Sequence, residues 1–321
     1  MSTTAPTLDP AASQVLALLA GSGAPTLDQL DPPAAREALK ALLGLQAPKA
    51  AVAEVRDLAA DGAHGPIPLR LYRPRGSAAT EALPVLVYFH AGGWVIGDIE
   101  ICDALCRRIA NAARCAVVSV EYRLAPEHKF PAAVDDAYAA TCWVAQHAPS
   151  LGLGPSRIAV GGDSAGGNLA AVVSLLARDR RGPRLALQVL LYPVTDLHGG
   201  TQSRRSRGEG YFLTDALMRY FVDHYASSAA DLDDWRGSPL LARDHAGLPP
   251  ACVIVCGFDP LHDEGVAYAH KLQAAGVSVE LHDFEGQIHA FLLMDGAIAQ
   301  AATAIESIGA ALRRAFAMAD K

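Results

Sequence analysis

The 321-residue sequence predicts an α/β fold with an eight-stranded, mostly parallel sheet, flanked by helices and covered by a small helical cap. Apolar runs of strand length alternate with stretches of helical length, which is typical of a doubly wound sheet. The runs are apolar throughout, as in parallel strands that are buried on both faces. Two earlier segments alternate apolar and polar residues around a turn, and they predict one antiparallel pair.

The elements are expected in the following order. Apolar residues at helical spacing predict short helices at 11–20 and 33–45. The antiparallel pair is expected at Val52–Leu58 and Ile67–Tyr72, with Asp61-Gly62 as a turn signal. The buried strands are expected at Val85–Phe89, Ala116–Val120, Ile158–Val160, Leu187–Tyr192, Cys252–Cys256 and Val279–Phe284. The helices between them are expected near 100–112, 132–147, 165–178, 262–275 and 297–315.

Residues 196–235 interrupt this alternation. They include a predicted helix, Asp215–Tyr225, for which Thr214 is a suitable N-terminal cap. Long excursions between core elements are commonly lids or binding loops. We therefore predict a first cap segment at 1–48, a second at 196–235, and a catalytic domain in two parts at 49–195 and 236–321.

The composition excludes several classes of protein. With 51% hydrophobic and 19% charged residues, the chain has enough apolar material for a large core and too little charge for disorder. A net charge of −7 argues against nucleic acid as a partner. The only basic cluster contains Arg204, Arg205 and Arg207; we interpret it as a solvated loop, with attraction of an anionic substrate as the alternative.

No apolar stretch reaches transmembrane length, and no Lys or Arg precedes the apolar patch Val15–Ala20 as a secretory signal would require. The six cysteines contain no C-x-x-C pair, which predicts no metal site and no disulfide framework. Cys252 and Cys256 are expected to face the same way as small buried hydrophobes. We expect a soluble, cytoplasmic protein that does not bind membranes and is a monomer or a homodimer.

The most informative motif is Gly162-Asp163-Ser164-Ala165-Gly166, which lies between a predicted strand and a predicted helix. A G-x-S-x-G pattern in this position is typical of a nucleophile elbow, in which a serine hydroxyl protrudes from a tight turn. Glycines at 162 and 166 keep Cβ atoms out of the bend. We therefore predict that Ser164 is a nucleophile.

An elbow serine needs a base, which is expected after it in the chain. His289 lies just beyond the last predicted strand and is the expected base. His262, His270 and His282 are the nearby alternatives. We expect His270 in the middle of a helix and His282 pointing sideways from a strand, and His262 lies too close in sequence to the expected acid.

That acid is Asp259, which follows the strand Cys252–Cys256 and can meet a histidine on the next loop at the same sheet edge. Asp263 and Glu264 are the alternatives; we interpret them as acids that interact favourably with the N-terminus of a helix.

Backbone N–H donors for a tetrahedral oxyanion are expected from Ala165 and from the loop His90-Ala-Gly-Gly-Trp94. We interpret His90 as a structural residue that braces this loop.

Together these motifs resemble the hormone-sensitive-lipase-like group (bacterial family IV) of α/β-hydrolases, which contains carboxylesterases and lipases with an HGGG loop and a GDSAGG elbow. The resemblance covers about residues 50–315. The matching motifs are His90-Ala-Gly-Gly-Trp94, Glu121-Tyr-Arg-Leu-Ala-Pro-Glu-His128, Phe130-Pro-Ala-Ala, Gly162-Asp-Ser-Ala-Gly-Gly-Asn168, Tyr192-Pro-Val-Thr-Asp196, Asp259-Pro-Leu and Glu285-Gly-Gln-Ile-His289.

The resemblance implies a serine carboxylesterase that acts on short- to medium-chain esters through an acyl-enzyme and needs no cofactor. It implies these site residues: Ser164, His289 and Asp259 as the triad, and Gly92, Gly93 and Ala165 as oxyanion donors. The chain departs from the family at Ala91, usually the first glycine of HGGG, and at Ala290, frequently a glycine.

Trp94, Tyr211 and Phe212 are candidate pocket walls, with packing inside the cap as the alternative for the last two. Two other functions stay open: an acyltransferase or amidase with the same triad, and a ligand-binding protein without activity.

Overall fold

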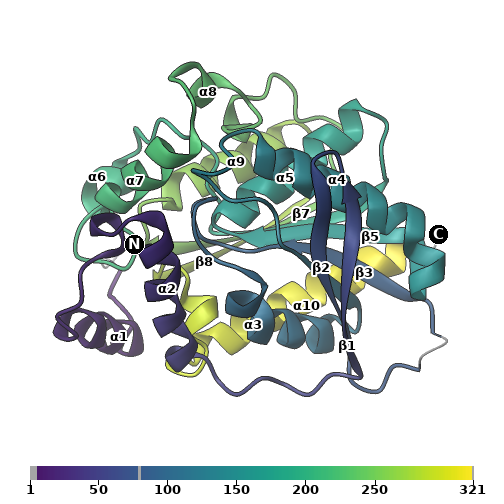
Figure 1. The fold of residues 1–321 in the computed structure, drawn as a ribbon, viewed down its shortest axis with the longest axis horizontal. Helices are drawn as coiled ribbons and strands as arrows, with labels where there is room; N and C mark the ends of the chain where they lie inside the picture. The colour runs from purple at the N-terminus through teal and green to yellow at the C-terminus, as the bar shows by residue number, and fades with distance from the viewer. Residues whose placement is uncertain (1–5, 79–80, 320–321) are drawn as a thin grey trace, which may run out of the picture.

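The computed structural model describes residues 6–78 and 81–319, and within them the predicted eight-stranded sheet is confirmed. The strand order is β1-β2-β4-β3-β5-β6-β7-β8 (Figure 1). β2 pairs antiparallel with both β1 and β4, and every other pair is parallel. The bounds are β1 Glu54–Gly62, β2 Gly65–Arg73, β3 Leu83–Phe89, β4 Ala116–Val120, β5 Leu153–Asp163, β6 Leu185–Leu191, β7 Ala251–Phe258 and β8 Val279–Ile288.

Helices cover both faces of the sheet, which explains the continuous apolar strands. In Figure 1, α3 (Ile99–Ala113) and α10 (Gln300–Ala319) lie below the sheet, and α4 (Ala132–His147), α5 (Ala165–Asp179) and α9 (His262–Ala274) lie above it. Successive side chains of a strand point to opposite faces. In β3, Val85, Val87 and Phe89 accordingly pack into one core and Leu86 and Tyr88 into the other.

Four helices gather on the left of Figure 1, beyond the carboxyl ends of the parallel strands. They are α1 (Pro10–Gly21), α2 (Pro32–Leu39), α6 (Gln202–Arg207) and α7 (Asp215–Tyr225), followed by the single turn α8 (Ala230–Asp233). Thr214 is the N-terminal capping residue of α7, as predicted: the Leu217 N–H donates to the Thr214 hydroxyl at 3.1 Å. The helix expected at 33–45 is α-helical only to Leu39 and continues as a 3₁₀ helix, Lys40–Leu45, which is longer than the 3₁₀ turns that usually end an α-helix.

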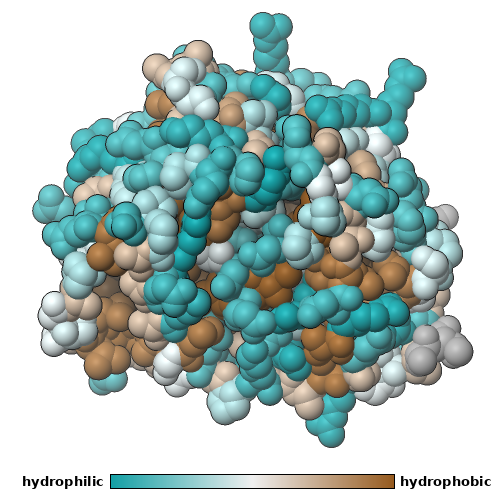
Figure 2. Space-filling model, viewed as in Figure 1, coloured by the Kyte–Doolittle hydropathy of each residue, from teal (hydrophilic) through white to brown (hydrophobic). Residues whose placement is uncertain are grey.

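The first cap segment begins with residues 1–5, which lie outside the described residues, and the domain boundaries stay a prediction. Figure 2 shows hydrophobic side chains gathered at the lower left, where α1 lies, and Leu18 of this helix is 62% exposed.

Cys252 and Cys256 are both fully buried in one core, as expected. Among the described residues, no helix combines the length and the apolarity needed to cross a bilayer.

Candidate active site

Ser164 occupies a sharp turn between β5 and α5. Its backbone has φ 56° and ψ −116°, a conformation that costs free energy for a residue with a Cβ and is concentrated at functional sites. The two glycines permit this turn, because a methyl group on Gly162 would collide with Gly166, and one on Gly166 would collide with the Phe89 carbonyl. The elbow therefore requires small residues at 162 and 166, as the motif predicts.

The structure brings together the three residues of the expected triad. Nε2 of His289 lies 2.9 Å from Oγ of Ser164, and Nδ1 of His289 lies 2.6 Å from Oδ2 of Asp259. Because a carboxylate only accepts, Nδ1 carries the proton and Nε2 is free to accept from the serine hydroxyl. All three side chains are buried, with 7% exposure for Ser164.

Two further contacts fix this arrangement. Oδ1 of Asp259 accepts from the Leu261 N–H at 2.9 Å, which orients the carboxylate. The ring of Tyr192 packs edge-on against the ring of His289, with the ring centroids 4.9 Å apart. The imidazole is thus held by a carboxylate on one side and an aromatic ring on another.

The alternative residues lie elsewhere. His262 bonds Asp263 and Asp283, each at 3.0 Å, and its pKa is raised to about 9, chiefly by the hydrogen bond to Asp283. Nε2 of His282 lies 3.9 Å from Glu280 on the same strand. Neither histidine bonds the serine.

Residues 90–97, which we call the glycine loop, follow β3 and border the serine. Gly92, Gly93 and Ser164 line the same cavity, and Ala165 is the first residue of α5. Within the described part of the chain, the N–H groups of Gly92, Gly93 and Ala165 bond no acceptor. His90 braces the loop: it stacks on Tyr122 at 4.2 Å.

An apolar cavity of about 40 Å³ lies against Ser164 and His289. Its walls come from the two cap segments, the glycine loop, α3 and the 3₁₀ turn after His289; they include Leu27, Leu39, Leu42, Ile96, Ile101, Phe212, Leu213, Leu217, Phe221 and Leu293. A water molecule needs about 10–15 Å³ of such space, so the cavity has room for roughly three.

Of the three candidate pocket walls, only Phe212 lines this cavity. Trp94 has φ 61°, is fully buried and stacks on Tyr225, with the ring centroids 4.3 Å apart. Tyr211 packs against Phe258 at 5.1 Å.

Two buried carboxylates near the site have raised pKa values. Burial raises the pKa of Asp163 to about 6, although the Tyr88 hydroxyl donates to it at 2.8 Å. Burial also raises the pKa of Glu264 to about 8, although the carboxylate accepts from the Thr195 N–H at 2.7 Å. Glu264 therefore holds the loop after β6, a more specific role than that of an acid at a helix N-terminus.

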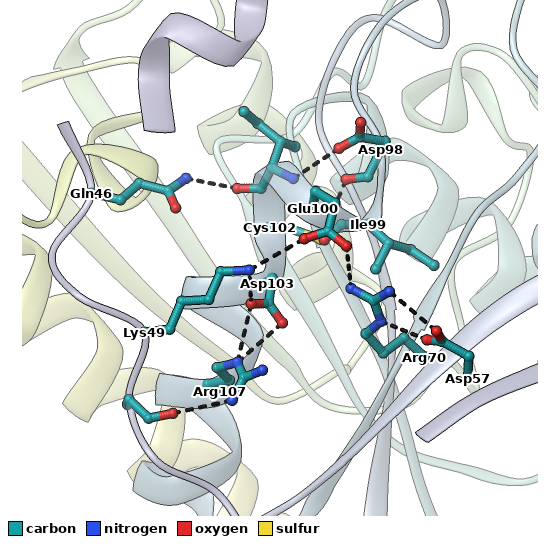
Figure 3. Close-up of polar contacts among 12 residues, drawn as sticks. Gln46, Lys49, Asp57, Arg70, Asp98, Ile99, Glu100, Cys102, Asp103 and Arg107 are labelled. Carbon is teal, nitrogen blue, oxygen red and sulfur yellow. Dashed lines mark hydrogen bonds and ion pairs between the residues drawn. The ribbon is translucent and has the colours of Figure 1, made fainter. Parts of the chain in front are cut away.

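Figure 3 shows how the end of the first cap segment and the chain that follows it are anchored to α3. The side-chain amide of Gln46 donates to the Ile101 carbonyl at 2.7 Å, and Lys49 bonds Asp103 at 2.5 Å and Glu100 at 3.2 Å. Arg70 continues the network through ion pairs with Glu100 and Asp57. The network holds Ile101, a residue of the cavity wall, against the chain that leaves the cap.

Several residues in the wall of the cavity at Ser164 were not predicted from the sequence. Leu217 and Phe221 lie four residues apart and so share one face of α7, a signal that was available, and Leu213 lies just before this helix. Leu39 and Leu42 gave no such signal, because only the tertiary fold carries them to the serine. Within the described residues, no group of three or more His, Cys, Asp or Glu side chains could hold a metal ion.

A mixed eight-stranded sheet with helices on both faces, a serine elbow after β5 and a histidine after β8 defines the α/β-hydrolase class. A model of the alpha/beta hydrolase fold family matches residues 86–293. The chain therefore belongs to this family, in the hormone-sensitive-lipase-like branch that its motifs resemble.

The relatives agree with this placement. The chain is 50% identical to the carboxylic ester hydrolase LipN of Mycobacterium tuberculosis over 245 residues, 74% of this chain and 64% of LipN, slightly under two thirds. It is 42% identical to the esterase LipI of the same organism over 261 residues, 81% of each chain. An ester hydrolase structure from the metagenome of Lake Arreo superposes with a TM-score of 0.94 at 43% identity, covering 97% of this chain and all of that one. The predicted class, a carboxylic ester hydrolase, is confirmed.

Proposed function

We propose that the protein is a serine carboxylesterase in which Ser164, His289 and Asp259 form a catalytic triad. The observation that carries this proposal is the continuous hydrogen-bonded chain from Asp259 through His289 to Ser164, at 2.6 and 2.9 Å. An aligned chain of acid, imidazole and hydroxyl is the arrangement that activates a serine for acyl transfer.

In the first half of the reaction, Oγ of Ser164 attacks the ester carbonyl carbon while Nε2 of His289 takes the hydroxyl proton. Asp259 stabilises the imidazolium that results. The carbonyl oxygen becomes an oxyanion, and the tetrahedral intermediate collapses when His289 returns its proton to the leaving alcohol. The product of this half is the acyl-enzyme.

In the second half, a water molecule attacks the acyl-enzyme and gives its proton to His289. Collapse of the second intermediate releases the carboxylic acid, and His289 returns the proton to Ser164. Each half forms one bond to the acyl carbon and breaks another, and the triad ends unchanged.

We assign the oxyanion to the N–H groups of Gly92, Gly93 and Ala165. These groups bond no acceptor in the described residues, and the first two border the same cavity as the serine. Preorganised donors of this kind are worth roughly 10²- to 10³-fold in rate each. The replacement of the usual glycine by Ala91 leaves the next two positions of the loop as glycines.

The substrate we propose is a small-molecule ester with a short acyl chain. The apolar walls favour an uncharged acyl group, and the cavity of about 40 Å³ leaves little room beyond a few carbon atoms. Longer chains would have to displace Leu39 or the α7 side chains.

The test is hydrolysis of p-nitrophenyl esters from acetyl to palmitoyl by the wild type and by Ser164→Ala. We expect the highest kcat/KM at acetyl to hexanoyl, and no activity above background in the variant. A maximum at palmitoyl would contradict the short-chain substrate, and an active Ser164→Ala would contradict the nucleophile. If the wild type is folded but hydrolyses none of these esters, the result would favour amide hydrolysis or acyl transfer.

A further inference from the structure

Arg36, on the cap helix α2, reaches the glycine loop from outside the active site. Its Nε donates to the Val95 carbonyl at 2.9 Å, and its Nη2 donates to the Ala125 carbonyl at 3.0 Å. Nη1 and Nη2 also bond the Glu127 carboxylate at 2.8 and 2.7 Å. One guanidinium therefore joins three segments of the chain: α2, the glycine loop and residues 125–127.

The donors proposed for the oxyanion depend on the orientation of two peptide planes. The Gly92 N–H shares a plane with the Ala91 carbonyl, which accepts from Nδ1 of His90 at 2.7 Å. The Gly93 N–H shares a plane with the Gly92 carbonyl, which accepts from the N–H groups three and four residues further on, at 3.0 and 2.9 Å. In a planar trans peptide the C=O and N–H point in opposite directions. The hydrogen bonds to the Ala91 and Gly92 carbonyls therefore set the directions of the Gly92 and Gly93 N–H groups.

Arg36 holds the end of this turn. Val95 donates its N–H to the Gly92 carbonyl, and its own carbonyl accepts from Arg36. The Ala125 N–H donates to the Trp94 carbonyl at 2.8 Å, and the Ala125 carbonyl accepts from Arg36 as well. The guanidinium therefore ties the turn to the segment beside it through both Val95 and Ala125.

We propose that Arg36 is a positioning residue: by bonding the Val95 and Ala125 carbonyls, it fixes the turn that aims the Gly92 and Gly93 N–H groups at the oxyanion. This inference rests on the proposed role of the two glycines. It makes the cap helix a support of the catalytic machinery as well as a wall of the pocket.

The planar guanidinium is required for this role. Its five N–H groups in a fixed fork let it bond two carbonyls and a carboxylate at once, whereas the ammonium of lysine is a point charge on a flexible stem. The two carbonyls accept from Nε and Nη2, and the Glu127 carboxylate accepts from Nη1 and Nη2. Glu127→Gln keeps an acceptor oxygen and leaves both carbonyl bonds in place, so it separates the ion pair from the positioning contacts.

The chain offers a matched control. Nη1 of Arg178 also donates to two backbone carbonyls from a distant segment, those of Asp244 at 3.0 Å and Ala246 at 2.9 Å. None of these three residues lines the cavity at Ser164. Arg178→Met removes the same kind of contact without reaching the glycine loop.

The experiment compares the wild type with Arg36→Met, Arg36→Lys, Glu127→Gln and Arg178→Met. It measures kcat and KM for p-nitrophenyl butyrate, the inhibition constants of a butyl trifluoromethyl ketone and of the matching methyl ketone, and thermal unfolding. The trifluoromethyl ketone adds to the serine and places an oxyanion at the glycine loop, whereas the methyl ketone stays a neutral ground-state ligand.

We expect Arg36→Met to lower kcat by about 10- to 100-fold, with KM changed less than about 3-fold, because a misaligned donor acts on the transition state. Binding of the trifluoromethyl ketone is expected to weaken by the same factor, and binding of the methyl ketone to stay constant. Arg36→Lys is expected to show a smaller loss of the same kind. Glu127→Gln and Arg178→Met are expected to keep kcat within about 3-fold.

Three results would overturn the inference. The first is that Arg36→Met, or Arg36→Lys if the methionine variant does not fold, retains the wild-type kcat and affinity for the trifluoromethyl ketone. The second is that the variant loses affinity for both ketones equally, which would indicate a loosened cap. The third is that Arg178→Met lowers kcat as much as Arg36→Met does, which would indicate general destabilisation. A wild type that binds the two ketones equally would instead contradict the proposed function.

Discussion

Asp259→Asn is the substitution whose consequence the structure defines most closely. The carboxylate accepts twice, from the Leu261 N–H at 2.9 Å and from Nδ1 of His289 at 2.6 Å. An asparagine has one acceptor oxygen, and the backbone N–H of Leu261 cannot become an acceptor. The oxygen therefore stays with Leu261 and the amide NH₂ faces His289. Nδ1 must then accept, so the ring proton moves to Nε2, which faces the Ser164 hydroxyl 2.9 Å away.

In that tautomer His289 cannot take the serine proton. The reversed amide would set an NH₂ group against the buried Leu261 N–H and leave both unsatisfied, at about 1–3 kcal/mol. Loss of the correct tautomer in a Ser-His-Asp triad costs about 10⁴-fold in kcat, or roughly 5 kcal/mol in activation free energy.

The assay is kcat for p-nitrophenyl butyrate, with thermal unfolding as a check on folding. The matched control is Asp263→Asn, because Asp263 bonds His262 and Ser203 and does not contact His289. We expect the control to stay within about 10-fold of the wild type. An Asp259→Asn variant within that same range would refute the reasoning.

Three further predictions follow from the cavity and the buried acid. Gly93→Ala is expected to lower kcat/KM by at least about 100-fold, because Gly93 has φ +57° and a methyl group there would overlap the Phe221 ring; near-normal kinetics would contradict its role as a donor. Leu39→Ala opens the wall between the cavity at Ser164 and an outer cavity of about 260 Å³, so the p-nitrophenyl ester optimum is expected to move to longer chains; an unchanged profile would count against this wall. Glu264→Gln is expected to gain stability relative to the wild type between about pH 5 and pH 9, measured by urea unfolding. Since burial raises the pKa of Glu264 to about 8 from an ordinary 4.5, the unfolded chain releases this proton first and wild-type stability falls over that interval by up to roughly 5 kcal/mol; a difference independent of pH would be the contrary result.

Much of the fold was predictable because both faces of the sheet are buried. A strand such as β7, whose side chains pack into a core on each face, has to be apolar at every position, and this gives it a recognisable sequence. The predicted strand bounds were less accurate. β5 begins at Leu153, but it was expected to begin at Ile158, because Gly154 and Pro155 resemble a turn in the sequence. The order of Ser164, Asp259 and His289 was predictable because each follows a strand at the same edge of the sheet.

The pocket was less predictable, because its walls depend on how the cap packs. Phe221 and Leu39 come from separate cap segments, and the sequence does not specify that both meet Ser164. Trp94, next to the glycines, was expected at the wall, but its ring is fully buried and stacks on Tyr225. Arg36 gave no signal either, since its partners are backbone carbonyls about 60 and 90 residues away.

The central claim, that Ser164 is the nucleophile of an acyl-transfer triad, is tested most directly by covalent labelling. The wild type and Ser164→Ala are treated with diethyl p-nitrophenyl phosphate, the released p-nitrophenol is counted, and the modified peptide is identified by mass spectrometry. We predict one equivalent of p-nitrophenol per wild-type chain, a diethyl phosphoryl group on Ser164 and loss of esterase activity, with no labelling of the variant. Labelling at another residue, or equal labelling of Ser164→Ala, would contradict the account.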